Sequence, residues 1–321
     1  MTMWSHIDIA TLKNMGVMGG CYILDELRYR TTMNGKPFVS GKLSDASGSI
    51  DFVMWEDCPL SHEDVGKIIY VDAWVSQYKG ALQATLSGAH LATGQELAVL
   101  DMTKLIPVAP INIERAYYEI GDALVGYLFE SKYAQIALGL LMDHKDLIMR
   151  CPAAKSVHHA FGGGWVMHVH HMLKLAQHIC DLYGERYHID CALLLAGVIL
   201  HDIGKLREFT LNEYGLVKQY SDEGKLLGHS ALGVLMVEEK AKELNVPKEM
   251  LLPLQHMILS HHGKAEFGAA VEPMCIEAQI LTYLDGLDSR MEMCRCALDK
   301  TEKGQFSDLI RALNKQIYRV A

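Results

Sequence analysis

The features of membrane and secreted proteins are missing from this sequence of 321 residues. The longest apolar run, Ala192–Leu200, ends at His201-Asp202 and falls short of the ~18–20 residues that a membrane-spanning helix needs. The first residues, MTMWSHIDIA, lack the basic segment and the apolar segment of a secretory signal. We therefore expect a cytoplasmic protein that does not bind a membrane.

Cysteine pairs with metal-binding spacing are also missing. The eight cysteines are scattered over positions 21, 58, 151, 180, 191, 275, 294 and 296, and no two of them form a CxxC motif. This distribution argues against a disulfide framework and against a zinc knuckle, and it fits a reducing compartment.

Positive charge is not in excess. The chain has 30 Lys and Arg against 39 Asp and Glu, which gives a net charge of −9 at pH 7. This balance argues against a protein that coats nucleic acid through an overall positive charge. It allows a local binding site whose positive charge comes from metal ions. Histidine, in contrast, is abundant, and 12 of the 16 histidines lie between His158 and His262. Because histidine is the commonest metal ligand, this clustering indicates a metal site.

The N-terminal part has the pattern of a small β-barrel. Short runs rich in β-branched and aromatic residues are separated by turn signals such as Asn34-Gly35 and Lys79-Gly80. Five strands, with hairpins joining the first three and a longer gap at 56–66, are typical of an OB-fold. The expected strands are Tyr22–Thr32, Pro37–Leu43, Ile50–Trp55, Lys67–Val75 and Ala81–Leu86.

The rest of the chain has a helical period. Apolar residues recur at helical spacing from position 112 onward, beginning with Ile113, Ala116 and Ile120. We therefore expect a multidomain α and β protein, with an OB-fold-like barrel at 1–95, a linker at 96–111 and an all-helical domain at 112–321.

Histidine and aspartate residues follow one another in a distinctive order along the helical part. Each member of the order H…HD…H…HH…D lies on a separate predicted helix or helix end. Imidazoles and carboxylates without thiolates suit Mn, Fe, Co, Ni or Zn, and a shared Asp can bridge two ions. A lone histidine is more often a core or surface residue than a metal ligand. The run His-Asp-Ile-Gly-Lys also fits the end of a helix that is capped by glycine. The prediction of a metal site therefore depends on all six residues appearing in this order. The set is His168, His201, Asp202, His229, His261 and Asp285, with His159 and His262 as candidates for a further ligand or a phosphate contact.

This ordered set resembles the metal-binding residues of the HD-domain superfamily of phosphohydrolases, with His229 and His261 matching the added ligands of its two-metal members. More narrowly, the chain resembles the YhaM family of bacterial 3′-to-5′ exoribonucleases, which join an OB-fold to an HD domain. The segments that carry the resemblance are TTMNGKPFVSGKLSDASGSIDFVMWED (31–57), CPAAKSVHHAFGGGWVMH (151–168), LAGVILHDIGK (195–205), EGKLLGHSALG (223–233), MILSHHGKAEFGA (257–269) and ILTYLDGLDSRM (280–291).

The resemblance implies a metal-dependent exonuclease that acts in RNA degradation. Its substrate would be the 3′ end of single-stranded RNA, with single-stranded DNA as a second substrate. Manganese is the metal that the resemblance suggests first, ahead of Fe, Co, Ni, Zn and Mg. Two ions would be held by the six-residue set, with Asp202 as the bridge, and would activate a phosphodiester for in-line displacement.

Two basic residues near the motif are candidates for phosphate contacts. Lys205 lies one turn from the His-Asp pair and, with Asp202, is expected to be catalytic by neutralising charge on the phosphate. The alternative is a solvated lysine at a helix end. Arg290 either contacts phosphate or forms a structural ion pair with Asp288 or Glu292.

The barrel offers a surface for single-stranded nucleic acid. An OB-fold stacks bases on exposed aromatic residues, and strand alternation turns several aromatic side chains outward here. The alternative is that these aromatic residues fill the barrel core. Residues 1–100 hold 7 basic and 11 acidic residues, so this domain should guide a strand and not grip it tightly. The candidates for nucleic-acid binding are Phe38, Lys42, Trp55, Trp74 and Tyr78.

Other functions use parts of the same pattern. Another HD-domain phosphodiesterase or nucleotide phosphohydrolase has little use for an OB-fold, and GKAEFGAA after His262 lacks the Gly-Tyr-Pro element of cyclic-di-GMP hydrolases. The same ligands also suit two irons and oxygenase chemistry. A non-enzymatic single-strand-binding regulator would have a degenerate ligand set, whereas this set is complete. The apolar helical surface is compatible with a homo-oligomer.

Overall fold

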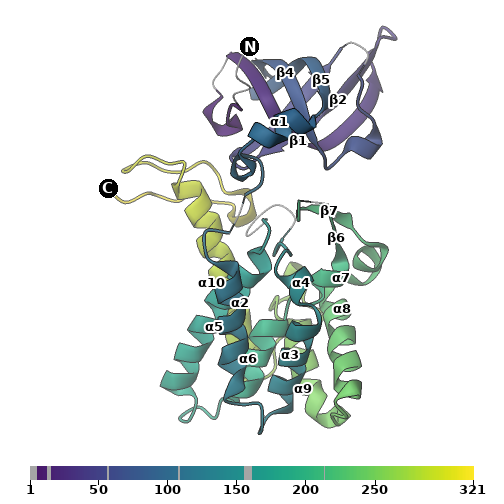
Figure 1. The fold of residues 1–321 in the computed structure, drawn as a ribbon. Coiled ribbons are helices and arrows are strands. Elements are labelled where there is room, and N and C mark those ends of the chain that lie inside the picture. Colours follow the sequence, from purple (N-terminus) through teal and green to yellow (C-terminus); the bar gives the residue numbers. More distant parts are fainter. Residues whose placement is uncertain (1–5, 13–15, 56–57, 108, 155–160, 213) are drawn as a thin grey trace. The chain divides into compact units, whose positions relative to one another are not determined.

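The chain folds into two compact units, residues 1–108 and 109–321 (Figure 1). The computed structural model describes the chain except for residues 1–5, 13–15, 56–57, 108, 155–160 and 213. Among the described residues, no helix combines the length and the apolar character needed to cross a membrane. All eight cysteines are free thiols.

The first unit is a closed five-stranded barrel, as the strand pattern predicts. Its strand order is β1-β2-β3-β5-β4, and the pairing is antiparallel except between β3 and β5. Closure leaves no sheet edge for other chains to extend. The strands are β1 (Gly16–Thr31), β2 (Pro37–Asp45), β3 (Gly48–Met54), β4 (Ile68–Tyr78) and β5 (Ala81–Leu91).

Short helical elements flank the strands of this unit. Ser61 and Asp64 form a capping box around the turn in the β3–β4 gap, and Thr93 and Glu96 do the same at the helix after β5. The segment expected as a linker, 96–111, includes most of this helix. The elements are η1 (Ile9–Thr11), η2 (His62–Asp64), α1 (Gly94–Val99) and η3 (Met102–Lys104).

The second unit is helical, as the sequence period predicts, and it also contains a short hairpin of two strands. Nothing in the 3.6-residue period indicates that hairpin, in which the Asn212 side chain accepts hydrogen bonds from the backbone of Tyr214 and Leu216. The helices are α2 (Ile113–Val125), α3 (Lys132–Asp143), α4 (Lys145–Ile148), α5 (Gly164–Tyr183), α6 (Cys191–Leu200), α7 (Lys205–Glu208), α8 (Asp222–Glu243), α9 (Lys248–Ser260) and α10 (Ile276–Leu298); the other elements are β6 (Phe209–Leu211), β7 (Val217–Tyr220), η4 (Ala265–Phe267) and η5 (Arg311–Leu313).

Helix α6 is the centre of the helical unit. Asp190 caps its N-terminus by accepting a hydrogen bond from the backbone of Leu193, and every residue from Ala192 to Leu200 is buried. The helix is apolar on all sides because α2, α3, α5, α9 and α10 pack around it (Figure 1). Its C-terminal end therefore delivers the residues that follow, His201 and Asp202, into the interior of the unit.

Gly41 in β2 pairs with Leu27 of β1, one residue pair beyond the register shift between Leu24 and Glu26. A Cβ at this position would lie 2.0 Å from the Glu26 carbonyl oxygen and 2.7 Å from the Phe52 ring. The barrel therefore needs glycine there, because neither backbone nor a packed ring yields easily.

We expect Gly41→Ala to lower the free energy of unfolding by about 1–3 kcal/mol through overpacking. Urea unfolding followed by tryptophan fluorescence measures this change. Gly16→Ala is the matched control in the same barrel, since no described residue beyond its chain neighbours lies within 4 Å of its ideal Cβ position. Equal stability of the two variants would contradict this account of the barrel.

Candidate metal centre

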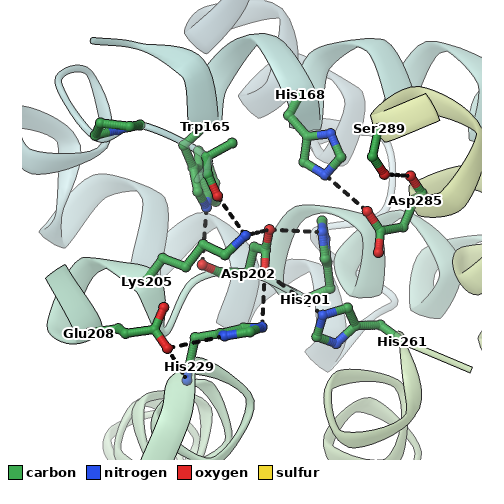
Figure 2. A network of polar contacts seen from close by, with 12 residues as sticks. Trp165, His168, His201, Asp202, Lys205, Glu208, His229, His261, Asp285 and Ser289 are labelled. Atoms are coloured by element: carbon green, nitrogen blue, oxygen red, sulfur yellow. Dashed lines mark hydrogen bonds and ion pairs between the residues drawn. The ribbon is translucent and has the colours of Figure 1, made fainter. Parts of the chain in front are cut away.

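Six residues of the sequence-predicted set come together inside the helical unit (Figure 2). They arrive from five separate parts of the chain, so only the tertiary fold brings them near one another. His168 lies on α5, His201 and Asp202 follow α6, His229 lies on α8, His261 follows α9, and Asp285 lies on α10.

The Asp202 carboxylate is at the middle of this arrangement. Its Oδ2 atom lies 3.3 Å from His201 Nε2 and accepts a 2.6 Å bond from Lys205 Nζ. Its Oδ1 atom lies 3.5 Å from His229 Nε2 and 3.8 Å from His261 Nε2. The two oxygens of one carboxylate therefore face two different groups of histidines.

The first group is His168, His201 and Asp202, whose ligand atoms all lie within 4.8 Å of one another. His168 Nε2 also lies 3.4 Å from Asp285 Oδ1, while its Nδ1 bonds to Asp288 Oδ2 at 2.7 Å. Burial alone would lower the pKa of His168, but hydrogen bonds and charge from Asp285 and Asp288 outweigh it and raise the pKa to about 9. This buried pocket thus attracts positive charge strongly.

The second group is His229, His261 and His262, and its ligand atoms also lie within 4.8 Å of one another. His261 donates from Nδ1 to the Ile258 carbonyl at 2.7 Å, and His262 donates from Nδ1 to the Phe267 carbonyl at 3.0 Å. His262, which the sequence suggests as a further ligand or a phosphate contact, therefore lies beside His229 and His261.

The tautomers of these histidines suit metal binding. A ring nitrogen that bonds to a carbonyl must carry the proton, so Nε2 of His201, His261 and His262 presents its lone pair. His201 Nε2, His229 Nε2 and Asp202 Oδ1 are buried, and none has a hydrogen-bond partner among the described residues. Buried polar atoms without partners are costly, and a bound cation would satisfy all three.

The electrostatics keep Asp202 and His261 in the protonation states that bind metal, whereas His168, whose pKa is raised, must release a proton when a metal binds. Burial alone would raise the pKa of Asp202, but the charges of Lys205 and His201 outweigh it and hold the pKa well below its ordinary value. Burial holds the pKa of His261 well below its ordinary value, and His201 and His262 add to the effect. An ionised carboxylate and a neutral imidazole are the forms that ligate a cation.

Two glycines allow His229 to reach Asp202. Gly228 has a φ of 73° and interrupts α8 directly before His229, which frees the His229 backbone N–H to donate to Glu208 Oε1 at 3.0 Å. The Glu208 carboxylate also lies 3.3 Å from His229 Nδ1. A Cβ on Gly204 would lie 1.9 Å from the His229 carbonyl, so that close approach requires glycine.

The Lys205 side chain is mostly buried in the site. Its Nζ donates to Asp202 Oδ2 and to the Ala153 carbonyl, each at 2.6 Å, and its side chain is only 12% exposed. The alternative of a solvated lysine at a helix end is therefore wrong.

Two candidates near the motif remain, Arg290 and His159. Arg290 is exposed. Its two expected partners are engaged with other residues, since Asp288 bonds to His168 and Glu292 pairs with Arg295 at 2.7 Å. His159 lies outside the described residues.

Sequence reasoning missed several residues that support the ligands. Asp288 lies one helical turn after Asp285, so its spacing could have indicated it. No spacing points to Glu208, because its contact with His229 joins residues 21 positions apart. Trp165 donates from Nε1 to the Asp202 carbonyl at 3.2 Å, across a separation of 37 residues.

The aromatic candidates on the barrel lie at its surface. Trp55, Trp74 and Tyr78 are each about half exposed, at 54%, 49% and 56%. Phe38 stacks on Trp55 with ring centroids 5.0 Å apart, and Lys42 on the same face of β2 is partly exposed. The alternative, that these rings fill the core, does not hold for the three exposed ones.

Comparison with known proteins agrees with the fold. Residues 166–290 match the model of the HD domain family. An N-terminal barrel followed by a helical HD domain thus defines the class of this protein.

The chain is also 39% identical over 294 residues to the 3′-5′ exoribonuclease YhaM of Bacillus subtilis (strain 168), an alignment that covers 89% of each chain. The chain belongs to the YhaM family.

We expect Asp288→Ala to weaken metal binding by about 10–100-fold, because His168 then loses the hydrogen-bond acceptor that orients its ring. This is the usual loss when a residue that orients a metal ligand is removed. Asp288→Asn should recover most of the affinity, since its amide oxygen still accepts from Nδ1. Calorimetric titration of metal-free protein with Mn²⁺ measures the effect. Asp299→Asn, at the exposed end of α10, is the control, and an unchanged affinity in Asp288→Ala would refute the orienting role.

Proposed function

We propose that this chain is a metal-dependent 3′-to-5′ exoribonuclease that acts on single-stranded RNA, with single-stranded DNA as a second substrate. The observation that carries the proposal is the Asp202 carboxylate, whose two oxygens face two groups of histidines in one buried site. The polarity and the substrate are inferred from the relation to YhaM.

Two divalent ions fit the residues present. We assign one ion to His168, His201, Asp202 and Asp285, and the other to Asp202, His229, His261 and His262. Nitrogen and oxygen ligands without thiolate suit Mn²⁺, which we propose first, and also Fe, Co, Ni, Zn and Mg. When bound, such a pair of ions supplies Lewis-acid activation and stabilises both the attacking and the leaving oxygens of an in-line displacement.

The protein contributes the orientation of these ligands. Asp288 and Glu208 hold the rings of His168 and His229, and backbone carbonyls hold the other three imidazoles. Lys205 donates to Asp202 Oδ2, so it positions the proposed bridging carboxylate and adds a positive charge beside the site of phosphate binding. Preorganised groups of this kind lower the barrier because they need not rearrange as charge develops.

The barrel is proposed to guide the RNA strand. Exposed aromatic rings provide stacking platforms that every base can use, and Lys42 lies on the same face of β2 as Phe38. The acidic balance of residues 1–100 keeps this contact weak, which suits a strand that must advance as its end is removed.

The first test uses 5′-labelled single-stranded RNA. We expect a ladder of shortened products in Mn²⁺ and none in EDTA. Asp202→Ala should reduce the rate of product formation by more than ~100-fold, because it removes a ligand from both ions. The value of ~100-fold is the largest loss usual for a residue that only orients a ligand. Asp222→Ala, whose side chain is 95% exposed, is the control. RNA binding without any metal-dependent product would overturn the proposal in favour of a single-strand-binding protein.

The second test concerns the barrel. Trp74→Ala and Phe38→Ala should each weaken binding of a long single strand by about 5–150-fold, the equivalent of ~1–3 kcal/mol for one stacked base. Phe129→Ala, which removes a fully exposed ring from the helical unit, should leave affinity unchanged. Fluorescence anisotropy in EDTA separates binding from cleavage. Equal affinity of all three variants would exclude base stacking on these barrel rings.

The third test concerns strand access. A buried site cannot admit a duplex, and the net charge of −9 provides no broad basic platform for gripping one. We expect a 3′ overhang to be trimmed back to the duplex edge, while a recessed 3′ end resists digestion. Equal rates on the two substrates, or cleavage of a circular RNA, would rule out an exonuclease that requires a free 3′ end.

A further inference from the structure

A second group of metal-ligating side chains lies in the barrel, separate from the helical unit. His6, Asp8 and Asp45 each offer one atom, and these atoms all lie within 4.8 Å of one another. His6 Nε2 is 3.2 Å from Asp45 Oδ2 and 3.5 Å from Asp8 Oδ1. The N-terminal segment and the end of β2 meet at this point.

The ring of His6 is fixed in one tautomer. Its Nδ1 bonds to the Cys21 carbonyl at 2.8 Å and must therefore carry a proton. In the neutral ring Nε2 directs its lone pair at two carboxylate oxygens, which is repulsive unless a metal ion lies between them or Nε2 itself is protonated. The side chain is only 5% exposed, and Nε2 has no hydrogen-bond partner in the described part of the chain.

Asp45 is held rigidly by its neighbours. Its Oδ1 accepts bonds from the Ser47 N–H at 2.7 Å, the Ser47 hydroxyl at 2.6 Å and the Gly48 N–H at 2.9 Å. Its Oδ2 accepts a 2.7 Å bond from the Ile9 N–H and retains a lone pair for the His6 side. The carboxylate is thus a fixed ligand, already oriented by a turn.

The spacing suits a single ion. Nitrogen and oxygen ligands at ~2.0–2.2 Å from a metal lie ~2.8–3.6 Å apart when the angle at the metal is octahedral or tetrahedral. The two distances from His6 Nε2, 3.2 and 3.5 Å, fall in this range. A ligating histidine also usually donates its other N–H to a carbonyl or carboxylate, as His6 does to Cys21.

We propose that the barrel binds one divalent transition-metal ion between His6, Asp8 and Asp45, in addition to the metals of the helical unit. The ion would be structural, because it fastens the N-terminal segment to the β2–β3 turn. His6 also lines a pocket together with Asp101 and Lys104, and the Asp8 side chain is 41% exposed, so solvent reaches the ligands from that side. The competing arrangement is a proton on Nε2, assisted by Lys104, whose Nζ is 3.8 Å from Asp8 Oδ1.

Metal counting on the full-length protein tests the proposal. Protein stripped with a chelator is dialysed against Zn²⁺ or Mn²⁺, desalted and analysed for bound metal per chain. We expect His6→Gln and Asp8→Asn each to bind one ion fewer than the wild type. His62→Gln, which removes another barrel histidine, should bind as many ions as the wild type.

This test does not depend on the proposed nuclease activity. It compares the number of bound ions between the wild type and variants whose helical unit is unchanged. Asp202→Ala should lose metal from the helical unit and keep the barrel ion, so the two proposals fail separately. Circular dichroism checks folding, and Asp8, whose side chain is 41% exposed, gives a variant that does not disturb the core. If either folded variant binds as many ions as the wild type, a proton and not a metal joins these residues.

Discussion

The structure of the helical unit depends on one buried carboxylate, that of Asp202. Removing a carboxylate from water is costly unless charge and hydrogen bonds compensate it. Here Lys205 supplies the nearby charge, while one oxygen still lacks a hydrogen-bond partner among the described residues. That oxygen faces His229 and His261, so the compensation is completed only when a cation binds between them.

This constraint explains features of the fold that otherwise look unrelated. An entirely apolar α6 is needed to carry Asp202 to the centre of the unit. Gly204 is needed because the chain carrying His229 comes within van der Waals contact of the turn after α6. Gly228 is needed because its φ of 73° interrupts α8 directly before His229. The barrel carries a smaller version of the same arrangement, in which His6 directs a buried nitrogen at the Asp45 carboxylate. In both places a backbone or carboxylate acceptor fixes the ring before any ligand binds.

The sequence predicts those parts of the molecule that local patterns encode. Strand alternation and turn dipeptides predict the barrel, the 3.6-residue period predicts the helices, and the order of His and Asp residues predicts which side chains gather. Two supporting contacts could not be predicted, because they join positions far apart in the chain: Glu208 to His229, and Trp165 to Asp202. Asp288 differs, since it lies one helical turn after Asp285. The β6–β7 hairpin was also missed, since its strands of three and four residues are too short to show a period. Such pairings are decided by packing and not by local propensity.

Anomalous X-ray diffraction from crystals grown with Mn²⁺ tests the central claim most directly. The account predicts two peaks in the helical unit, one beside His168 and His201 and the other beside His229 and His261, with the Asp202 carboxylate between them. A single peak, or two peaks that share no ligand, would contradict it.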